Sequence, residues 1–254
     1  MGAAAVAALA AEGRPVLMAC RNLAKAREVQ ASVLQRFPDA DLAIGRLDLS
    51  SLDSVRRFAD SVPPGSVSAL FNNAGVISKD YSLTDDGLEN TFSVNYFGPW
   101  LLTQLLLPKL PSDAAIVNMV SLTCRFVKAD VSMLTPEEKD FSQLGTYARS
   151  KRALLAFSLE LARRRPSLRV NLADPGIVAS DMIDLGHWYD PLADALFKPF
   201  CRRPERGVQP ALRALSAASG PFLYRGKSFV PVPRSYLDPA FDSALWTRTE
   251  RRLL

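Results

Sequence analysis

The chain has 254 residues, 48% of them hydrophobic, and a formal net charge of +5 at pH 7. These values fit a single α/β domain, residues 1–254, with a substantial apolar core, and they give no basic face of the kind that nucleic-acid binding requires. Three widely spaced cysteines argue against a disulfide framework and a metal site, and no apolar run approaches the ~20 residues of a membrane span. We therefore expect a cytoplasmic protein without a bound metal.

Strand-like and helix-like segments alternate along the chain. An alanine-rich helix is expected over 2–12, ending at Gly13, and is followed by a short buried strand over 15–20. Further helices are expected over 22–36, 51–61, 85–109, 143–165, 205–217 and 239–252, and further strands over 41–47, 67–73, 114–120, 168–173 and 228–232. This order predicts a parallel sheet with helices on both faces, in which ligands bind beyond the carboxyl ends of the strands.

The residues that follow the predicted strands include side chains that can carry chemistry. NNAG, 72–75, and DPG, 174–176, are turn-like segments, and each is an ordinary turn if taken alone. A long predicted helix contains YARSK, which places Tyr147 and Lys151 on one helical face, although this pair alone is common on helix surfaces. An ammonium near a phenol lowers the pKa of the phenol, which suits general acid–base catalysis, and Ser121 could donate a hydrogen bond to a substrate oxygen.

Taken together, NNAG, the asparagine of SVNYFG, the serine after strand 114–120, YARSK and DPG resemble, in this order, the short-chain dehydrogenase/reductase family, from residue 2 to at least 182. The segments ACRN, LDLSS and TDDGLENTFSVNYFGPWLLTQLLLP resemble its retinol-dehydrogenase-like and protochlorophyllide-reductase-like members. The resemblance implies a Rossmann-like, doubly wound sheet and hydride transfer between a nicotinamide cofactor and a carbonyl or alcohol substrate. It also implies a homo-oligomer formed through helices 85–109 and 143–165.

The resemblance assigns a role to each of four side chains at the reaction centre. Tyr147 would be the catalytic acid and base, and Lys151 would lower its pKa and bind the nicotinamide ribose. Ser121 would orient the substrate oxygen, and Asn95 would hold a water molecule in the proton relay. The residues implied in cofactor binding are Gly2, Arg21, Asn22, Asp48, Leu49, Asn73, Ala74, Gly75, Tyr147, Lys151, Pro175, Gly176 and Val178, and Ser180 stands where the family often has threonine.

The residue after the strand at 15–20 bears on the choice of cofactor. In dinucleotide-binding folds an acidic side chain at this place binds the ribose hydroxyls of NAD, whereas an arginine accepts the 2′-phosphate of NADP. The sequence has Arg21 there and no acid, so we predict that NADP(H) is favoured over NAD(H). The alternative is a surface arginine that opens a loop.

The start of the sequence departs from the family pattern. The family begins with a strand and TGxxxGxG, whereas here only Gly2 aligns, with the last of these glycines. The additional strand would lie at the centre of the sheet, so we expect a slot with unpaired backbone groups and exposed apolar surface. Two interpretations stay open: a truncated form of an ordinary reductase, or a relative with weak cofactor binding that acts as a scaffold or regulator.

Two long segments at the ligand end of the sheet are candidates for the walls of a substrate pocket. Residues 122–142 separate Ser121 from Tyr147, and residues 181–203 are rich in apolar and aromatic side chains. They suggest an apolar small-molecule substrate, or aromatic residues that only pack the loop down. A hydrolase that uses Ser121 and His187 is a further alternative, but no GxSxG surrounds the serine.

Overall fold

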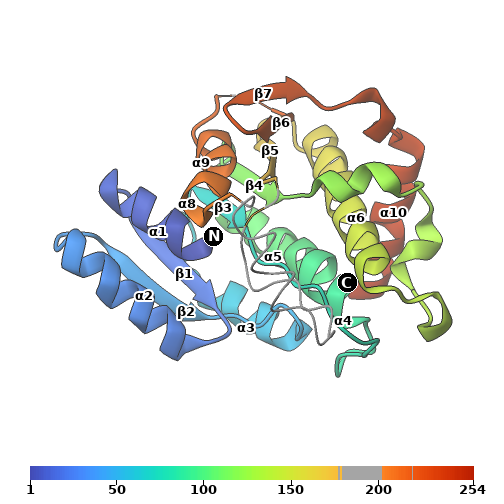
Figure 1. The fold of residues 1–254 in the computed structure, drawn as a ribbon, viewed down its shortest axis with the longest axis horizontal. Helices are drawn as coiled ribbons and strands as arrows, with labels where there is room; N and C mark the ends of the chain where they lie inside the picture. Colours follow the sequence, from blue (N-terminus) through green and yellow to red (C-terminus); the bar gives the residue numbers. More distant parts are fainter. Residues whose placement is uncertain (177, 179–201, 219) are drawn as a thin grey trace.

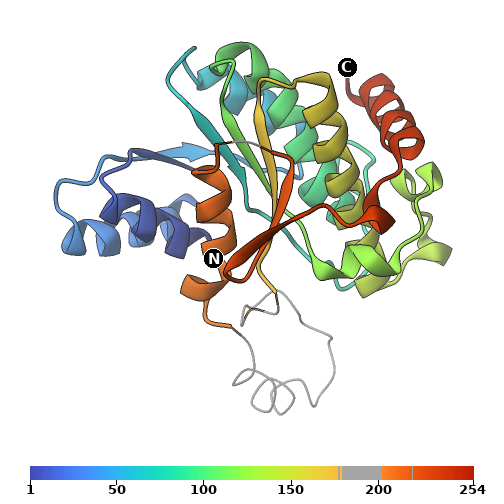
Figure 2. The same cartoon turned by 90° about the horizontal axis from the view of Figure 1, so that it is seen from above.

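Mainly parallel strands, flanked by helices on both faces, form the centre of the molecule (Figures 1 and 2). The computed structural model describes residues 1–176, 178, 202–218 and 220–254. The strands are β1 (Val16–Cys20), β2 (Leu42–Arg46), β3 (Ala69–Asn72), β4 (Ala115–Met119), β5 (Arg169–Asp174), β6 (Phe222–Arg225) and β7 (Ser228–Pro231). The predicted α/β fold class is confirmed, because strands and helices alternate and the strands from β1 to β6 pair in parallel.

The helices follow the predicted order along the chain. The longer ones are α1 (Gly2–Ala11), α2 (Leu23–Arg36), α3 (Leu52–Ser61), α5 (Gly98–Leu106), α6 (Gln143–Arg164), α9 (Gln209–Leu215) and α10 (Pro239–Leu253). Shorter helical segments are α4 (Asn90–Phe92), the π-helix η1 (Ser93–Phe97), α8 (Pro204–Gly207) and the 3₁₀ segments η2 (Leu107–Lys109), η3 (Leu122–Phe126), η4 (Val131–Leu134), η5 (Glu138–Asp140) and η7 (Arg234–Tyr236). Most predicted boundaries therefore lie within two residues of the observed ones.

The observed elements differ from the predicted ones in three places. The helix predicted over 85–109 begins at Asn90, because the Glu89 side chain accepts hydrogen bonds from the backbone N–H groups of Thr91 and Phe92, at 3.0 and 2.8 Å. The helix predicted over 205–217 is divided into α8 and α9. Strand β6 was not predicted; it pairs with β5 and turns into β7 at Gly226, whose positive φ of 58° suits glycine.

The described strands form two sheets rather than one. β1 pairs with β2, whereas β3, β4, β5 and β6 form a second parallel sheet to which β7 adds an antiparallel edge. The break falls between β1 and β3, where the family resemblance puts a further strand. Leu17 in β1 is 40% exposed, and Ala69, Leu70 and Phe71 in β3 are only partly buried, so apolar side chains of both strands beside the break are incompletely covered.

Helix α10 packs against α6 and closes the largest apolar cluster of the protein. The ring of Trp246 on α10 stacks on Phe157, with centroids 5.7 Å apart, and meets Trp100 of α5 edge-on at 5.5 Å. The buried hydroxyl groups of Tyr96 and Thr249 lie 2.7 Å apart and connect η1 to α10. The helices predicted over 85–109 and 143–165, which the family resemblance implies in binding a second copy of the chain, are therefore both in contact with α10.

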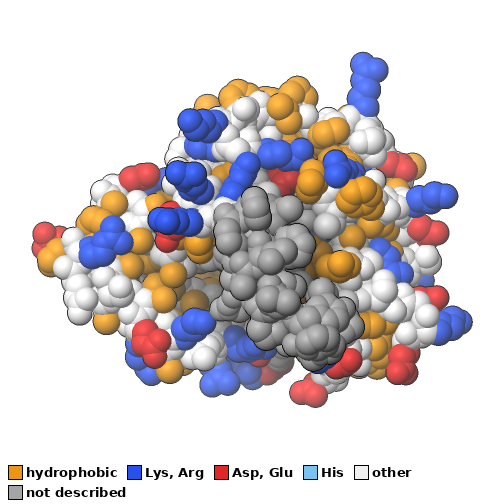
Figure 3. All heavy atoms as spheres, viewed as in Figure 1, with side chains coloured by type: hydrophobic (Ala, Val, Ile, Leu, Met, Phe, Trp, Pro, Cys, Tyr) orange, Lys and Arg blue, Asp and Glu red, His pale blue; other side chains and the backbone are white. Residues whose placement is uncertain are grey.

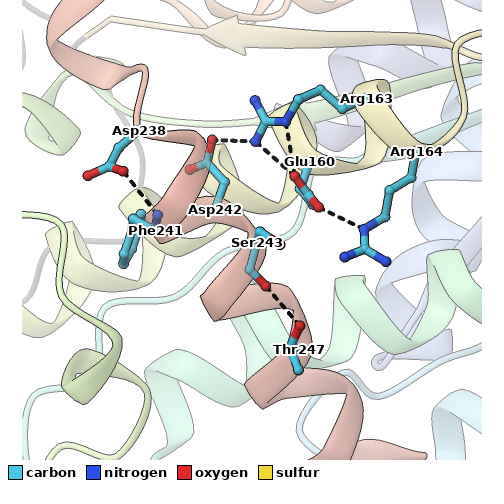
Figure 4. A network of polar contacts seen from close by, with 8 residues as sticks. All are labelled: Glu160, Arg163, Arg164, Asp238, Phe241, Asp242, Ser243 and Thr247. Atoms are coloured by element: carbon cyan, nitrogen blue, oxygen red, sulfur yellow. Dashed lines mark hydrogen bonds and ion pairs between the residues drawn. The ribbon is translucent and has the colours of Figure 1, made fainter.

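A network of ion pairs joins the carboxyl-terminal half of α6 to α10 (Figure 4). The Arg163 guanidinium lies 2.7 Å from the buried carboxylate of Asp242 and 2.9 Å from that of Glu160, and Glu160 also pairs with Arg164 at 2.8 Å. The Asp238 side chain accepts a hydrogen bond from the backbone N–H of Phe241 and so begins the helix. Apolar and ionic contacts together fix α10 on α6.

Candidate active site

Tyr147 and Lys151 lie on one face of α6, as their spacing predicts. The Lys151 ammonium is 2% exposed, and its Nζ donates a hydrogen bond of 2.9 Å to the backbone carbonyl of Met119 at the end of β4. The same nitrogen lies 5.9 Å from the centroid of the Tyr147 ring. The catalytic pair predicted from YARSK is thus assembled beside the carboxyl end of β4.

The pKa values of this pair differ from the expectation that Lys151 lowers the pKa of Tyr147. Burial raises the pKa of Tyr147 to about 12, an effect that the charges of Cys124 and Asp174 reinforce and the hydrogen bond with Ser121 partly offsets. Burial also lowers the pKa of Lys151 to about 8. The expectation was wrong because both groups lose solvent on folding, and desolvation is the largest cause of both pKa shifts.

Asn95 occupies the middle of the π-helix η1 and is fully buried. Its Oδ1 accepts a hydrogen bond of 2.8 Å from the N–H of Val76, and its Nδ2 donates to the carbonyl of Val76 at 2.9 Å and to Ser150 at 3.0 Å. A Cβ on Gly75 would lie 3.2 Å from Lys151 Nζ and 3.4 Å from Asn95 Oδ1. Asn95 therefore fixes the loop after β3, and Gly75 lets that loop approach the lysine; the predicted water relay stays a prediction.

Ser121 caps the 3₁₀ segment η3 directly after β4. Its Oγ accepts hydrogen bonds from the backbone N–H and the hydroxyl of Thr123, at 3.3 and 3.0 Å, and it is hydrogen bonded to Tyr147. The serine hydroxyl and the tyrosine hydroxyl thus form a pair that a carbonyl or alcohol oxygen can join. Cys124, which sequence reasoning did not single out, is buried beside them, and burial raises its thiol pKa to about 11.

The first residues of α1 lie against the loop after β3. A Cβ on Gly2 would be 3.2 Å from Asn73 Nδ2, and the buried Asn73 Oδ1 has no hydrogen-bond partner in the part of the chain that the structure describes. Ala74 is exposed on the same loop. Burial lowers the pKa of the α-amino group of Met1, and Glu205 and Lys25 act on it in opposite directions. A helix N-terminus, a glycine and an unsatisfied amide oxygen therefore meet where the cofactor was predicted.

The residues predicted for the adenosine end of the cofactor follow β1 and β2. β1 and β2 pair in parallel, and the N–H of Leu47 donates a hydrogen bond of 3.0 Å to the carbonyl of Cys20. The next residues along the chain, Arg21 and Asp48, therefore lie at the ends of two neighbouring strands. Arg21 is exposed. The Asp48 carboxylate accepts hydrogen bonds from the N–H and the hydroxyl of Ser50, at 3.0 and 2.6 Å.

Two neighbouring residues serve the local structure. The Asn22 side chain accepts a 3.0 Å hydrogen bond from the N–H of Lys25 and so caps α2. The Leu49 carbonyl lies only 2.6 Å from where a Cβ on Gly98 would be, which makes glycine necessary at the start of α5. The predicted cofactor contacts of both residues stay predictions.

The carboxyl end of β5 carries Asp174, Pro175 and Gly176. The Asp174 carboxylate accepts a hydrogen bond of 2.9 Å from the N–H of Gly176, whose φ is 72°. Val178 forms a parallel bridge with Arg202. The predicted residues Ser180 and His187, and most of the segment 181–203, lie outside the described residues.

The fold and the site define a doubly wound α/β protein with its polar side chains gathered at the carboxyl ends of β3, β4 and β5. The chain belongs to the short chain dehydrogenase family, whose profile matches residues 1–187. It is 32% identical over 237 residues to retinol dehydrogenase 12 of Homo sapiens, covering 91% of this chain and 74% of that protein. It therefore falls in the retinol-dehydrogenase-like branch of the family.

Other similar proteins extend beyond this chain or show the fold. The WW domain-containing oxidoreductase of Homo sapiens is 31% identical over 260 residues, covering 95% of this chain, and this chain spans 63% of its length. A crystal structure of a protein from Mycobacterium paratuberculosis has a TM-score of 0.76 at 30% identity and covers 100% of this chain and 90% of its own. A short-chain dehydrogenase from Sphingobium yanoikuyae in complex with NADPH, 17% identical with a TM-score of 0.64, covers 98% of this chain and 89% of its own and shares the fold. Within the described residues, no helix combines the length and hydropathy needed to cross a bilayer.

Proposed function

We propose that the protein is an NADP(H)-dependent oxidoreductase that transfers a hydride between the nicotinamide and a carbonyl or alcohol substrate. The observation that carries the proposal is that four side chains lie close together beside the carboxyl ends of β3 and β4. Tyr147 is hydrogen bonded to Ser121, and Lys151 and Asn95 both lie against Gly75. Retinol dehydrogenases, by their name, act on an alcohol, which agrees with this type of reaction.

The side chains of this protein supply the proton chemistry. With its pKa raised to about 12, Tyr147 is protonated near neutral pH, so its hydroxyl can give a proton to the substrate oxygen during reduction. Ser121 would donate a hydrogen bond to the same oxygen and orient it, and Lys151, whose Nζ is hydrogen bonded to the Met119 carbonyl, would bind ribose hydroxyls. Bound NADPH supplies the hydride that reaches the carbonyl carbon. A cytoplasmic location and a small-molecule substrate complete the proposal.

Several residues suit a dinucleotide. The buried Oδ1 of Asn73 has no hydrogen-bond partner among the described residues and can accept a hydrogen bond from a ligand, and glycine at positions 2 and 75 lets the backbone come close. The N-terminus of α1 favours a phosphate through its free amides. Exposed Arg21 at the end of β1, with no acid beside it in CRN, supports a preference for the 2′-phosphate of NADP(H).

The alternative, a scaffold or regulatory relative without catalysis, is favoured by the break between β1 and β3. Thermal unfolding with and without NADPH or NADH, followed by aldehyde reduction assays, decides between the two. Under the proposal NADPH raises the Tm more than NADH, and Tyr147→Phe abolishes turnover while the shift by NADPH persists. Equal Tm values with and without either cofactor would favour the scaffold.

A further inference from the structure

Two arginine side chains flank the turn at the carboxyl end of β5. Nε of Arg225, at the end of β6, donates a hydrogen bond of 2.9 Å to Oδ2 of Asp174, and Nη2 lies 2.8 Å from the same oxygen in an ion pair. The guanidinium of Arg202 lies on Gly176, since a Cβ there would be 3.4 Å from its Cζ and Nη1. Arg202 Nη1 also lies 3.5 Å from the carbonyl of Pro175. Both guanidinium groups are therefore held at this turn by the surrounding backbone and side chains.

The turn carries a net positive charge. Asp174 is 2% exposed and is paired with Arg225, whereas no ion pair within the described part of the chain joins Arg202 to a carboxylate. A third guanidinium, that of Arg213, donates to the carbonyl of Gly226, and a Cβ on Gly226 would be 3.9 Å from Arg202 Nη2. Lys and Arg side chains also gather along the upper border of the grey region in Figure 3.

This turn adjoins the catalytic hydroxyl groups. The charge of Asp174 contributes to the raised pKa of Tyr147 and also acts on Cys124 and Tyr236, although burial is the main cause in each case. Cys124 and Tyr236 pack in one cluster with Val120, the residue before the catalytic serine. Arg202 is exposed, so its guanidinium remains accessible from solvent.

We propose that Arg202 binds a carboxylate of the substrate, so that the substrates are aldehydes, ketones or alcohols that also carry an acidic group. This inference rests on the proposed function and names its substrate class. A planar guanidinium binds a carboxylate through two parallel hydrogen bonds, and the absence of a side chain at Gly176 lets the Arg202 guanidinium pack closely against this turn. An acidic group at this turn would fix the carbonyl near Tyr147, and it differs from the apolar substrate expected from the segment 181–203.

The experiment compares reduction of 4-carboxybenzaldehyde with that of 4-methylbenzaldehyde, a neutral aldehyde of similar shape, by the full chain with NADPH. The wild-type protein should have a higher kcat/KM for 4-carboxybenzaldehyde than for 4-methylbenzaldehyde. Arg202→Gln should reduce this ratio about tenfold, mainly through KM, as expected for loss of a charge-assisted pair. Arg202→Lys should restore part of it. The matched control is Arg203→Gln, which removes an equal charge from the next exposed residue and should keep the preference.

A binding measurement tests the carboxylate site at Arg202 independently of the proposed oxidoreductase function. Calorimetric titration of 4-carboxybenzyl alcohol into the protein with NADP⁺ should show binding that Arg202→Gln weakens and Arg203→Gln does not. If neither aldehyde is reduced although this binding depends on Arg202, the proposed function fails and the carboxylate site stands. Turnover of both aldehydes with equal preference in wild type and Arg202→Gln overturns the carboxylate site alone. Weaker NADPH binding in Arg202→Gln with unchanged preference also overturns it, since Arg202 would then serve the cofactor phosphates.

Discussion

The Lys151 ammonium nitrogen lies 2.9 Å from the backbone carbonyl oxygen of Met119, so helix α6 is joined to the end of β4 by a buried charged donor. This contact directs the side chain toward the carboxyl end of β4. Because a carbonyl oxygen carries only a partial charge, it compensates little of the cost of burying the ammonium. The pKa of Lys151 is consequently lowered to about 8.

The lowered pKa predicts how stability depends on pH. In the unfolded chain a lysine keeps its proton up to about pH 10.4, whereas folded Lys151 loses it near pH 8, so the unfolded state binds more protons between these values and stability rises with pH. Lys151→Met removes this pH-dependent contribution to the free energy of unfolding, which amounts to about 3 kcal/mol at about 1.4 kcal/mol per pKa unit. We expect the free energy of unfolding of the variant, relative to wild type, to decrease from pH 8 to pH 10 in urea titrations. A difference that is constant over this range would show that the ammonium is not destabilised by burial.

The loop after β3 provides a second test. In Gly75→Ala the added Cβ would lie 3.2 Å from Lys151 Nζ and 3.4 Å from Asn95 Oδ1, so one of these polar atoms must move. A shift of this kind at the reaction centre should reduce kcat for aldehyde reduction by about tenfold to a hundredfold while the fold is retained. Lys79→Ala, on an exposed residue further along the same loop, is the control. Equal kcat values in both variants and wild type would mean that the loop tolerates the displacement.

The sequence could predict where the candidate catalytic side chains lie, because each of them follows a strand or lies on a helix, as Ser121 and Tyr147 do. It could not predict the raised pKa of Tyr147, since the burial that causes it comes from tertiary packing. The pairing of Asp174 with Arg225 was missed for a similar reason. These residues are 51 positions apart and are brought together only by the pairing of β5 with β6, a strand that was itself not predicted. The one available signal was the acid in DPG.

Arg21, the residue after β1, predicts how tightly the protein binds NADPH and NADH. Arg21→Glu places a carboxylate where a 2′-phosphate is proposed to bind, so NADPH should bind about tenfold more weakly and NADH at least as well as before. Arg27→Glu, an equal change at an exposed position on α2, is expected to leave both affinities unchanged. Fluorescence titration of the two reduced cofactors measures the effect. Unaltered NADPH affinity in Arg21→Glu would refute the assigned role.

The contact between η1 and α10 predicts a stability effect. Thr249→Val keeps the side-chain shape but leaves the fully buried Tyr96 hydroxyl without its partner, which should reduce the free energy of unfolding by about 1–3 kcal/mol. The double variant Tyr96→Phe/Thr249→Val removes both hydroxyls and should recover part of this loss. Thr247→Val, on the same helix, is the control. Additive losses in the double variant would contradict the pairing of the two hydroxyls.

The position of α10 also predicts the oligomeric state. The family resemblance implies a dimer through helices 85–109 and 143–165, but in this protein Trp246 packs between Trp100 and Phe157 on those helices, and Asp242 pairs with Arg163. A second copy could use this surface only by displacing α10, which would expose the aromatic rings of Trp100 and Phe157 and the buried carboxylate of Asp242. We therefore expect light scattering after gel filtration to give the mass of one chain, 27.8 kDa. A dimer mass that reverts to one chain when charges are introduced on α5 or α6 would show that α10 leaves this face, whereas a dimer insensitive to them would point to a different interface.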